Sequence, residues 1–267
     1  MSIRVSTVNR WFLRFSKSSS PSLRLFCFPF AGSSASVFRP WIDKLPEEVE
    51  ILAIQLPGRE NRLREPCMSD MDEITEKLEL EIASCLETPF VFFGHSLGSL
   101  IAYELLRRLE TSGGHRAELF IASGGPAPHT CLAPAEPRKL TQDQILLDLR
   151  KIAQAHSSLL DDPEVLALML PMLRADFEIY ANYRYRETVP LQSSIVAIRG
   201  ARDAYVSHRS QLEWKRHTDR QFSFHTIPGP HLFMVDSSRA LLALVNSYLQ
   251  PILNRHHRRG LPLVQNA

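Results

Sequence analysis

The sequence predicts an α/β fold in which a mostly parallel sheet carries helices on both faces. Short runs rich in β-branched and aromatic residues alternate with segments of helical periodicity, and this alternation is interrupted only once. A chain of 267 residues is long enough for one large α/β domain with an inserted subdomain, and the apolar fraction of 44% is typical of a globular protein.

The expected strands are short, and turn-forming residues follow several of them. These strands are residues 23–28, 49–55, 90–93, 119–122, 194–198 and 222–227. One expected helix, residues 71–87, repeats Ile74, Leu78 and Ile82 at intervals of four, which places them on one apolar face. The other expected helices are residues 38–45, 96–109 and 236–249.

A helical segment from about 134 to 188 interrupts the alternation. It contains two apolar helical patterns, 145–149 and 165–170, has no convincing strand, and lies between two expected sheet strands. We therefore expect an inserted helical lid. The predicted parts of the chain are a basic, partly ordered N-terminal segment (1–20), two core parts (21–133 and 189–250), the lid (134–188) and a basic, disordered C-terminal tail (251–267).

Composition excludes several classes of protein. The formal net charge of +2 is too small to predict binding to nucleic acid, and no apolar run approaches the ~20 residues of a membrane span. An organellar transit peptide is one interpretation of the arginine- and serine-rich start, although Trp11 and Phe12 also suit a first strand. The four cysteines lie far apart, so we expect reduced thiols in a cytoplasmic protein and no zinc site or disulfide framework.

The most informative motif is Gly94-His95-Ser96-Leu97-Gly98. An apolar β-type run precedes it and a helical pattern follows, so the serine should lie on a sharp strand-to-helix turn with its hydroxyl exposed. Glycine suits the flanking positions because such a turn leaves no room for a Cβ, and the helix N-terminus favours nearby negative charge. The motif therefore predicts a nucleophile for acyl transfer, with a chance match to a short pattern as the alternative.

A serine nucleophile needs a base and a third group that orients the base, in the chain order serine, acid, histidine. Asp203 and His231 each follow a late strand, where open α/β sheets build their sites. Asp176 is the alternative acid, but it lies in the expected lid, where a charge on a helix face is the simpler interpretation. His95 is expected to point away from the site and to shape the turn around Ser96.

Two backbone amides are expected to bind the oxyanion that acyl transfer creates. One belongs to Leu97, the residue after the serine, and the other lies in the loop of residues 29–34. Small residues in that loop let the backbone approach a ligand, whereas the alternative is a simple turn without a role.

Seven segments occur in a characteristic order between about residues 10 and 250. They are Trp11-Phe12, Cys27-Phe28-Pro29-Phe30-Ala31-Gly32, Gln55-Leu56-Pro57-Gly58-Arg59-Glu60, Gly94-His95-Ser96-Leu97-Gly98, Leu173-Arg174-Ala175-Asp176, Gly200-Ala201-Arg202-Asp203 and Gly229-Pro230-His231-Leu232-Phe233. Together they resemble the type II thioesterases of nonribosomal peptide and polyketide synthases, to which the animal medium-chain fatty-acyl thioesterase is related. Two positions depart from the pattern, since Ser33 and Pro230 replace glycines, which affects loop conformation rather than a reacting side chain.

The resemblance implies an α/β-hydrolase fold with a mobile lid. It implies hydrolysis of acyl groups from the phosphopantetheine arm of acyl or peptidyl carrier proteins, often to clear stalled or wrong chains. Ser96, Asp203 and His231 would form the catalytic triad, and the amides of Ala31 and Leu97 the oxyanion hole. No metal or organic cofactor is implied, because the substrate itself carries the phosphopantetheine.

Three questions stay open in the sequence. A general carboxylesterase or lipase shares the triad, and a catalytically idle partner of a synthase would share the fold. The arginines at the end of the lid, Arg184 and Arg186, are either a contact for an acidic carrier protein or a solvated face.

Overall fold

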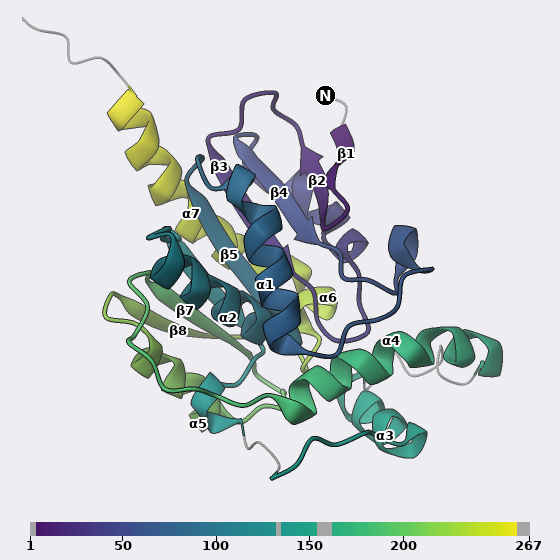
Figure 1. Cartoon of the computed structure of the whole chain (residues 1–267). Coiled ribbons are helices and arrows are strands. Elements are labelled where there is room, and N and C mark those ends of the chain that lie inside the picture. The colour runs from purple at the N-terminus through teal and green to yellow at the C-terminus, as the bar shows by residue number, and fades with distance from the viewer. Residues whose placement is uncertain (1–3, 132–134, 154–161, 261–267) are drawn as a thin grey trace, which may run out of the picture.

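The structure is a computed structural model that describes residues 4–131, 135–153 and 162–260. Its strands are β1 (Arg4–Asn9), β2 (Phe12–Ser16), β3 (Leu23–Phe28), β4 (Val49–Ile54), β5 (Phe90–His95), β6 (Leu119–Ser123), β7 (Ile195–Gly200) and β8 (Phe222–Ile227). They form one eight-stranded sheet in the order β1-β2-β4-β3-β5-β6-β7-β8 (Figure 1). The strands from β3 to β8 are all parallel, which confirms the predicted mostly parallel sheet.

The first two strands add an antiparallel edge that the sequence did not predict in full. β1 pairs with β2, and β2 pairs with β4, both in the antiparallel sense. Phe12 and Phe15 of β2 are buried on opposite faces of the sheet. The basic N-terminal segment is therefore held in place by its aromatic residues, while Arg14 forms an ion pair with Glu50 at 3.1 Å.

Helices cover both faces of the sheet. α1 (Met71–Ile82) and α2 (Leu97–Ser112) pack on one face, and η1 (Ala35–Lys44), α6 (Phe233–Asp236) and α7 (Ser238–Gly260) on the other (Figure 1). In β5, Phe90 and Phe92 join the core on the α1 side, whereas Val91 and Phe93 join the core on the α7 side. Central strands are apolar on both faces for this reason, which explains the continuous apolar runs in the sequence.

The predicted disorder of the C-terminal tail is wrong for residues 251–260, which continue α7 as a helix. Ile252 and Leu253 are buried in the core, and Arg255 donates to the carboxylate of Glu118 at 2.9 Å. The helix continues past its expected end because its apolar and basic side chains both find partners. The rest of the tail lies outside the described residues.

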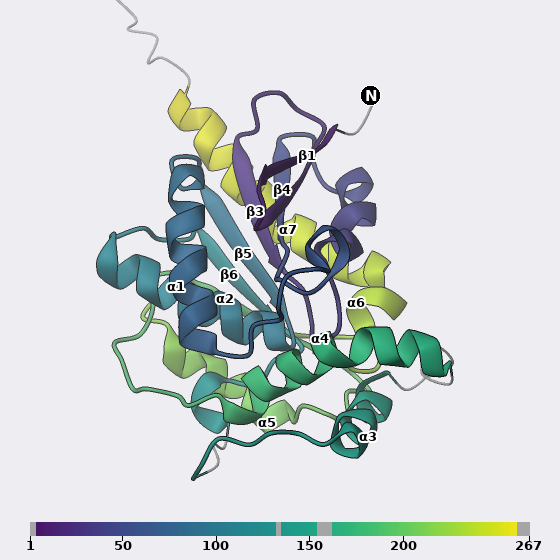
Figure 2. The ribbon, with the colours of Figure 1, turned by 45° about the vertical axis from the view of Figure 1, so that its right-hand side comes forward.

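Two helices between β6 and β7 cross the carboxyl ends of the strands (Figure 2). They are α3 (Gln142–Ala153) and α4 (Pro163–Asn182), and the described residues of 134–188 contain no strand. Ile145 and Ile152 of α3 cluster with Leu173 and Phe177 of α4, and this cluster includes Leu232 of the core. The two helices, called the lid below, are thus held on the sheet by apolar contacts.

Within the described residues, no helix is long and apolar enough to cross a membrane. The four cysteines are all unpaired, and Cys27 and Cys85 are buried in the core. Burial raises the pKa of the Cys27 thiol well above its usual value. This thiol is therefore protonated at neutral pH and behaves as a small apolar side chain.

Candidate active site

Ser96 occupies the sharp turn between β5 and α2, where its backbone has a φ of +54° and a ψ of −119°. A positive φ at a residue other than glycine is strained and persists only where the surroundings enforce it. A Cβ on Gly94 would lie 2.3 Å from the carbonyl oxygen of Gly98, and one on Gly98 would lie 2.2 Å from that of Phe28. The two flanking glycines therefore let α2 begin directly against the ends of β3 and β5.

The three residues expected to form a triad meet in one hydrogen-bonded chain. Nε2 of His231 lies 2.9 Å from Oγ of Ser96, and Nδ1 of His231 lies 2.9 Å from Oδ2 of Asp203. The other carboxylate oxygen, Oδ1, accepts the backbone N–H groups of Tyr205 and Val206, each at 2.9 Å. The backbone amides thus orient Asp203, Asp203 orients His231, and His231 is hydrogen bonded to Ser96.

Electrostatics keep the acid of this chain ionised. Burial by itself would raise the pKa of Asp203, but the hydrogen bond and charge of His231 and the two backbone amides outweigh it, and the pKa is lowered. Asp203 is therefore a carboxylate at neutral pH and faces an imidazole that is 0% exposed. At a site this buried, a carboxylate stabilises positive charge on the imidazole more strongly than it would in water.

His95 hydrogen bonds to the backbone of His231, a contact that the sequence did not predict. Nε2 of His95 lies 3.0 Å from the backbone oxygen of His231, and Nδ1 lies 2.9 Å from Oγ of Ser123. Burial and the charge of His231 lower the pKa of His95 to about 3, so His95 is neutral. Since a carbonyl only accepts, Nε2 carries the hydrogen, and Nδ1 accepts from the hydroxyl of Ser123.

The expected oxyanion amides belong to two segments that pack closely together. Ala31 lies in the loop after β3, and a Cβ on Gly98 at the start of α2 would lie 2.6 Å from the carbonyl oxygen of Pro29 in this loop. In the described part of the chain, no acceptor takes the amide hydrogen of Ala31 or Leu97. Both donors are therefore available to an oxyanion.

Asp176, the alternative acid, binds other partners. Its carboxylate accepts both terminal nitrogens of Arg59, at 2.8 and 3.0 Å, and the backbone N–H of Gly32 at 2.8 Å. The expectation of a charge on an exposed helix face is wrong, because Asp176 is 0% exposed. Asp203, not Asp176, hydrogen bonds to His231.

The triad is almost fully buried, and aromatic side chains lie beside it. Ser96 is only 8% exposed. The ring of Tyr205 lies 5.1 Å from that of His231, and Tyr180 of α4 lies 6.3 Å from Tyr205. An acyl group bound to Ser96 would therefore lie close to these aromatic rings.

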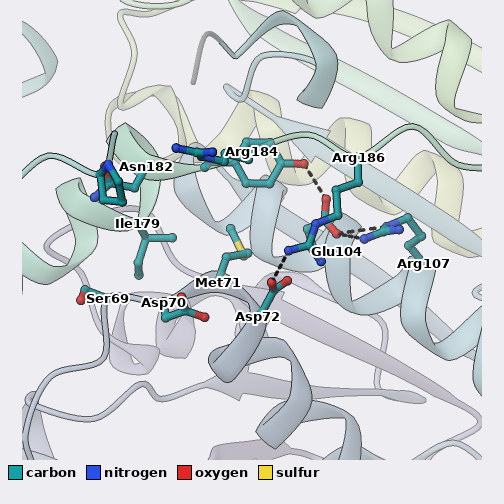
Figure 3. Close-up of a pocket in the computed structure, with 12 residues that line it drawn as sticks. Ser69, Asp70, Met71, Asp72, Glu104, Arg107, Ile179, Asn182, Arg184 and Arg186 are labelled. Atoms are coloured by element: carbon teal, nitrogen blue, oxygen red, sulfur yellow. Dashed lines mark hydrogen bonds and ion pairs between the residues drawn. The ribbon is translucent and has the colours of Figure 1, made fainter. Parts of the chain in front are cut away.

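A polar pocket of about 370 Å³ lies outside the triad, between α1, α2 and the end of α4 (Figure 3). Arg186 donates to Asp72 of α1 at 2.7 Å, although both side chains are more than half exposed. Arg184 donates to the backbone oxygen of Ala135 at 2.8 Å. Both arginines at the end of the lid thus have partners within the chain.

Among the described residues, no group of three histidine, cysteine or acidic side chains is placed to hold a metal ion.

The sheet order, the helical insertion after β6 and a Ser–His–Asp chain at the carboxyl edge of the sheet define an α/β hydrolase. Residues 23–249 match the family described as Thioesterase domain, and the chain belongs to this family. It is an enzyme that hydrolyses thioesters, as the motifs of its sequence indicated.

Relatives and solved structures agree with this assignment. Gramicidin S biosynthesis protein GrsT of Aneurinibacillus migulanus is 36% identical, over 93% of this chain and 97% of the relative. Thioesterase PikA5 of Streptomyces venezuelae is 33% identical, over 90% of this chain and 85% of the relative. The structure of the type II thioesterase BorB from the borrelidin biosynthetic cluster superposes with a TM-score of 0.80 at 28% identity, covering 92% of this chain and 98% of that one.

Proposed function

We propose that this enzyme removes acyl groups from the phosphopantetheine arm of carrier proteins of a nonribosomal peptide or polyketide synthase, as an editing activity in the cytoplasm. The hydrogen-bonded chain of Ser96, His231 and Asp203, in a member of the thioesterase family, carries the proposal. The names of similar proteins support this context, since one is a gramicidin S biosynthesis protein and another is a type II thioesterase from the borrelidin biosynthetic cluster. The four unpaired cysteines fit a reducing compartment.

In the proposed mechanism, Nε2 of His231 takes the proton of Ser96 as Oγ attacks the thioester carbonyl. The amides of Ala31 and Leu97 donate to the oxyanion of the tetrahedral intermediate. The C–S bond then breaks, and His231 gives the proton to the leaving thiolate, which needs little help because the pKa of a thiol is about 8.5.

Water completes the reaction. His231 takes a proton from the water as it attacks the acyl group on Ser96, and the free acid leaves as the serine recovers its proton. Asp203 holds the hydrogen on Nδ1, so that Nε2 can accept, and it stabilises the imidazolium. No step needs a metal or an organic cofactor, and the phosphopantetheine belongs to the substrate.

The lid favours acyl chains as substrates. Ile145, Leu173 and Phe177 of the lid are apolar and buried, in a cluster that includes Leu232, the neighbour of His231 in the chain. Moving the lid would expose this apolar surface, which an acyl chain can cover again.

The test compares one acyl group on three leaving groups: a carrier protein, a small thiol and an alcohol. We expect the highest kcat/KM for the carrier-bound thioester and no turnover in Ser96→Ala. If charged surfaces guide the carrier, added salt should lower kcat/KM on the carrier while small-thioester turnover changes little. Equal efficiency on carrier and small thiol would contradict carrier recognition, and faster turnover of the oxygen ester would favour an esterase.

A fluorophosphonate probe separates the enzyme from a catalytically idle binding partner. An activated serine reacts with the probe, so we expect stoichiometric labelling of the protein and none of Ser96→Ala. An unlabelled wild-type protein that still binds carrier proteins would support the idle partner.

A further inference from the structure

A buried ion pair joins three segments that lie far apart in the sequence. Arg59 lies in the loop after β4, Asp176 lies on lid helix α4, and the carboxylate of Asp176 also accepts the N–H of Gly32 in the loop after β3. The side chains of Arg59 and Asp176 are 3% and 0% exposed. A buried carboxylate with three donors is well satisfied, whereas either charge alone would be costly at this position.

The ion pair orders the peptide groups around Ala31. The N–H of Ala31 shares its peptide group with the carbonyl of Phe30, and that carbonyl accepts the N–H of Ser33 at 3.0 Å. The next N–H, that of Gly32, donates to Asp176 at 2.8 Å, and the carbonyl of Ser33 accepts from Arg59 at 2.8 Å. Successive peptide groups of this loop are thus tied to each other or to the ion pair.

Gly32 also shows how tightly α4 packs on the loop. Its φ is +79°, and a Cβ at this position would lie 2.6 Å from Cδ2 of Leu173. Leu173 lies on α4 one turn before Asp176 and is 0% exposed. The loop is therefore held on one side by an apolar side chain and on another by a carboxylate, both from the lid.

The other end of the loop is fixed by the segment that contains Arg59. Oε1 of Gln55 accepts the N–H of Ala35 at 2.9 Å, and the carboxylate of Glu60 accepts the hydroxyl of Ser34 at 2.6 Å. Nε2 of Gln55 donates to the same carboxylate at 2.7 Å. Among the described residues, the N–H of Ala31 has no protein acceptor, so the ordered loop can present it to an oxyanion.

We propose that Asp176 is a positioning residue that, together with Arg59, aims the Ala31 amide at the oxyanion and couples it to the lid. The inference rests on the proposed nucleophile and oxyanion amides, but not on carrier recognition. A lid helix that carries Asp176 away would also free the Gly32 amide, so the oxyanion loop is fully ordered only while α4 is docked.

The test uses Asp176→Asn, which keeps the size of the side chain but removes its charge. We expect kcat on a small acyl thioester to fall about 10- to 100-fold with little change in KM, because a misdirected oxyanion donor acts on the transition state. Two inhibitors with the same acyl chain give the specific measurement. A trifluoromethyl ketone forms an oxyanion with Ser96, whereas an unreactive thioether does not. The ketone should lose affinity by about the same factor as kcat/KM, and the thioether should bind as before.

Two further variants separate positioning from stability. Arg59→Met/Asp176→Leu removes both charges and leaves no lone buried ion, so a folded protein is expected. This variant should still lose kcat and ketone affinity. Glu50→Gln is the matched control, because Glu50 is a carboxylate only 2% exposed that pairs with two arginines, Arg24 at 3.0 Å and Arg14 at 3.1 Å. It lies near the amino end of β4, whereas the triad lies at the carboxyl ends of the parallel strands. The control variant should lower stability and leave the ratio of ketone to thioether affinity unchanged.

Recovery of kcat and ketone affinity in the double variant would overturn the proposal, since the pair would then serve stability alone. Equal weakening of ketone and thioether in Asp176→Asn would also overturn it. A wild-type protein that does not bind the ketone would instead contradict the proposed nucleophile, so the two failures are distinguishable.

Discussion

Replacing Asp203 with asparagine tests how the structure sets the tautomer of His231. Oδ1 of Asp203 accepts hydrogen bonds from two backbone N–H groups, those of Tyr205 and Val206, both at 2.9 Å. Two donors require an oxygen, so the carbonyl of an asparagine must face them and its NH2 group must face Nδ1 of His231. An NH2 group only donates, and Nδ1 must therefore accept.

The consequence falls on the opposite nitrogen of the ring. When Nδ1 accepts, the hydrogen sits on Nε2, the atom that lies 2.9 Å from Oγ of Ser96. This tautomer cannot take the serine proton, and the charge that would stabilise the imidazolium is also lost. The corresponding loss in a serine protease is about 10⁴ in kcat. We expect Asp203→Asn to lower kcat by about 10²–10⁴, or about 3–5 kcal/mol of barrier.

The assay is steady-state hydrolysis of a small acyl thioester, with the released thiol measured and folding confirmed by circular dichroism. Asp176→Asn provides the comparison, because it also neutralises a buried carboxylate near the site, and it should cost less activity than Asp203→Asn. A folded Asp203→Asn enzyme within tenfold of wild-type turnover, or one less impaired than Asp176→Asn, would refute the assignment of the acid.

Three further predictions concern the nucleophile, the turn and pH. Ser96→Ala should lower turnover by about 10⁴-fold or more with an unchanged circular dichroism spectrum, and near-normal turnover would contradict its role. Gly98→Ala should lower the Tm more than Gly114→Ala. An alanine at Gly114 is strained by the φ of +64° but its Cβ meets nothing within 4 Å, whereas the Cβ at Gly98 would meet the carbonyl of Phe28 at 2.2 Å; an equal loss would show that this contact relaxes. His217, like His95, is a buried histidine, with its Nδ1 3.0 Å from the hydroxyl oxygen of Tyr103 on α2. Burial first, and neighbouring charges second, lower the pKa of both His95 and His217 to about 3, below the usual 6.5. The unfolded chain therefore binds more protons below pH 6.5, and the free energy of unfolding should fall between pH 7 and pH 5 by up to about 2 kcal/mol per histidine. Urea unfolding at both pH values should show this loss, reduced in His217→Gln; a stability that does not fall, or an equal loss in the variant, would contradict it.

Local signals in the sequence were enough to predict the sheet and the Ser–His–Asp cluster. Apolar runs indicate the parallel strands because these strands are buried on both faces. The motif from Gly94 to Gly98 indicates Ser96 because only glycine fits at its two outer positions. Asp203 and His231 could be found because parallel strands end at one edge of the sheet. Those features depend on residues close together in the chain or on a general rule of topology.

The remaining features depend on partners that only the folded chain brings together. Asp176 has the sequence pattern of a helix-face charge, and its partner Arg59 lies 117 residues away. Arg255 is part of a basic run that resembles a solvated tail, yet Glu118 lies beside it in the fold. No local pattern specifies such pairs, because the ordinary solvated state of each side chain is equally compatible with the sequence.

The most direct test of the account is to trap the acyl group on the enzyme. The protein is mixed with a carrier protein that bears an isotope-labelled acyl thioester, quenched with acid within one turnover, and digested for mass spectrometry. We predict an acyl ester on the peptide that contains Ser96, and none in Ser96→Ala. Turnover of the carrier without an acyl ester on Ser96, or with the label on Cys67 or Cys131, the two cysteines that are not fully buried, would contradict this mechanism.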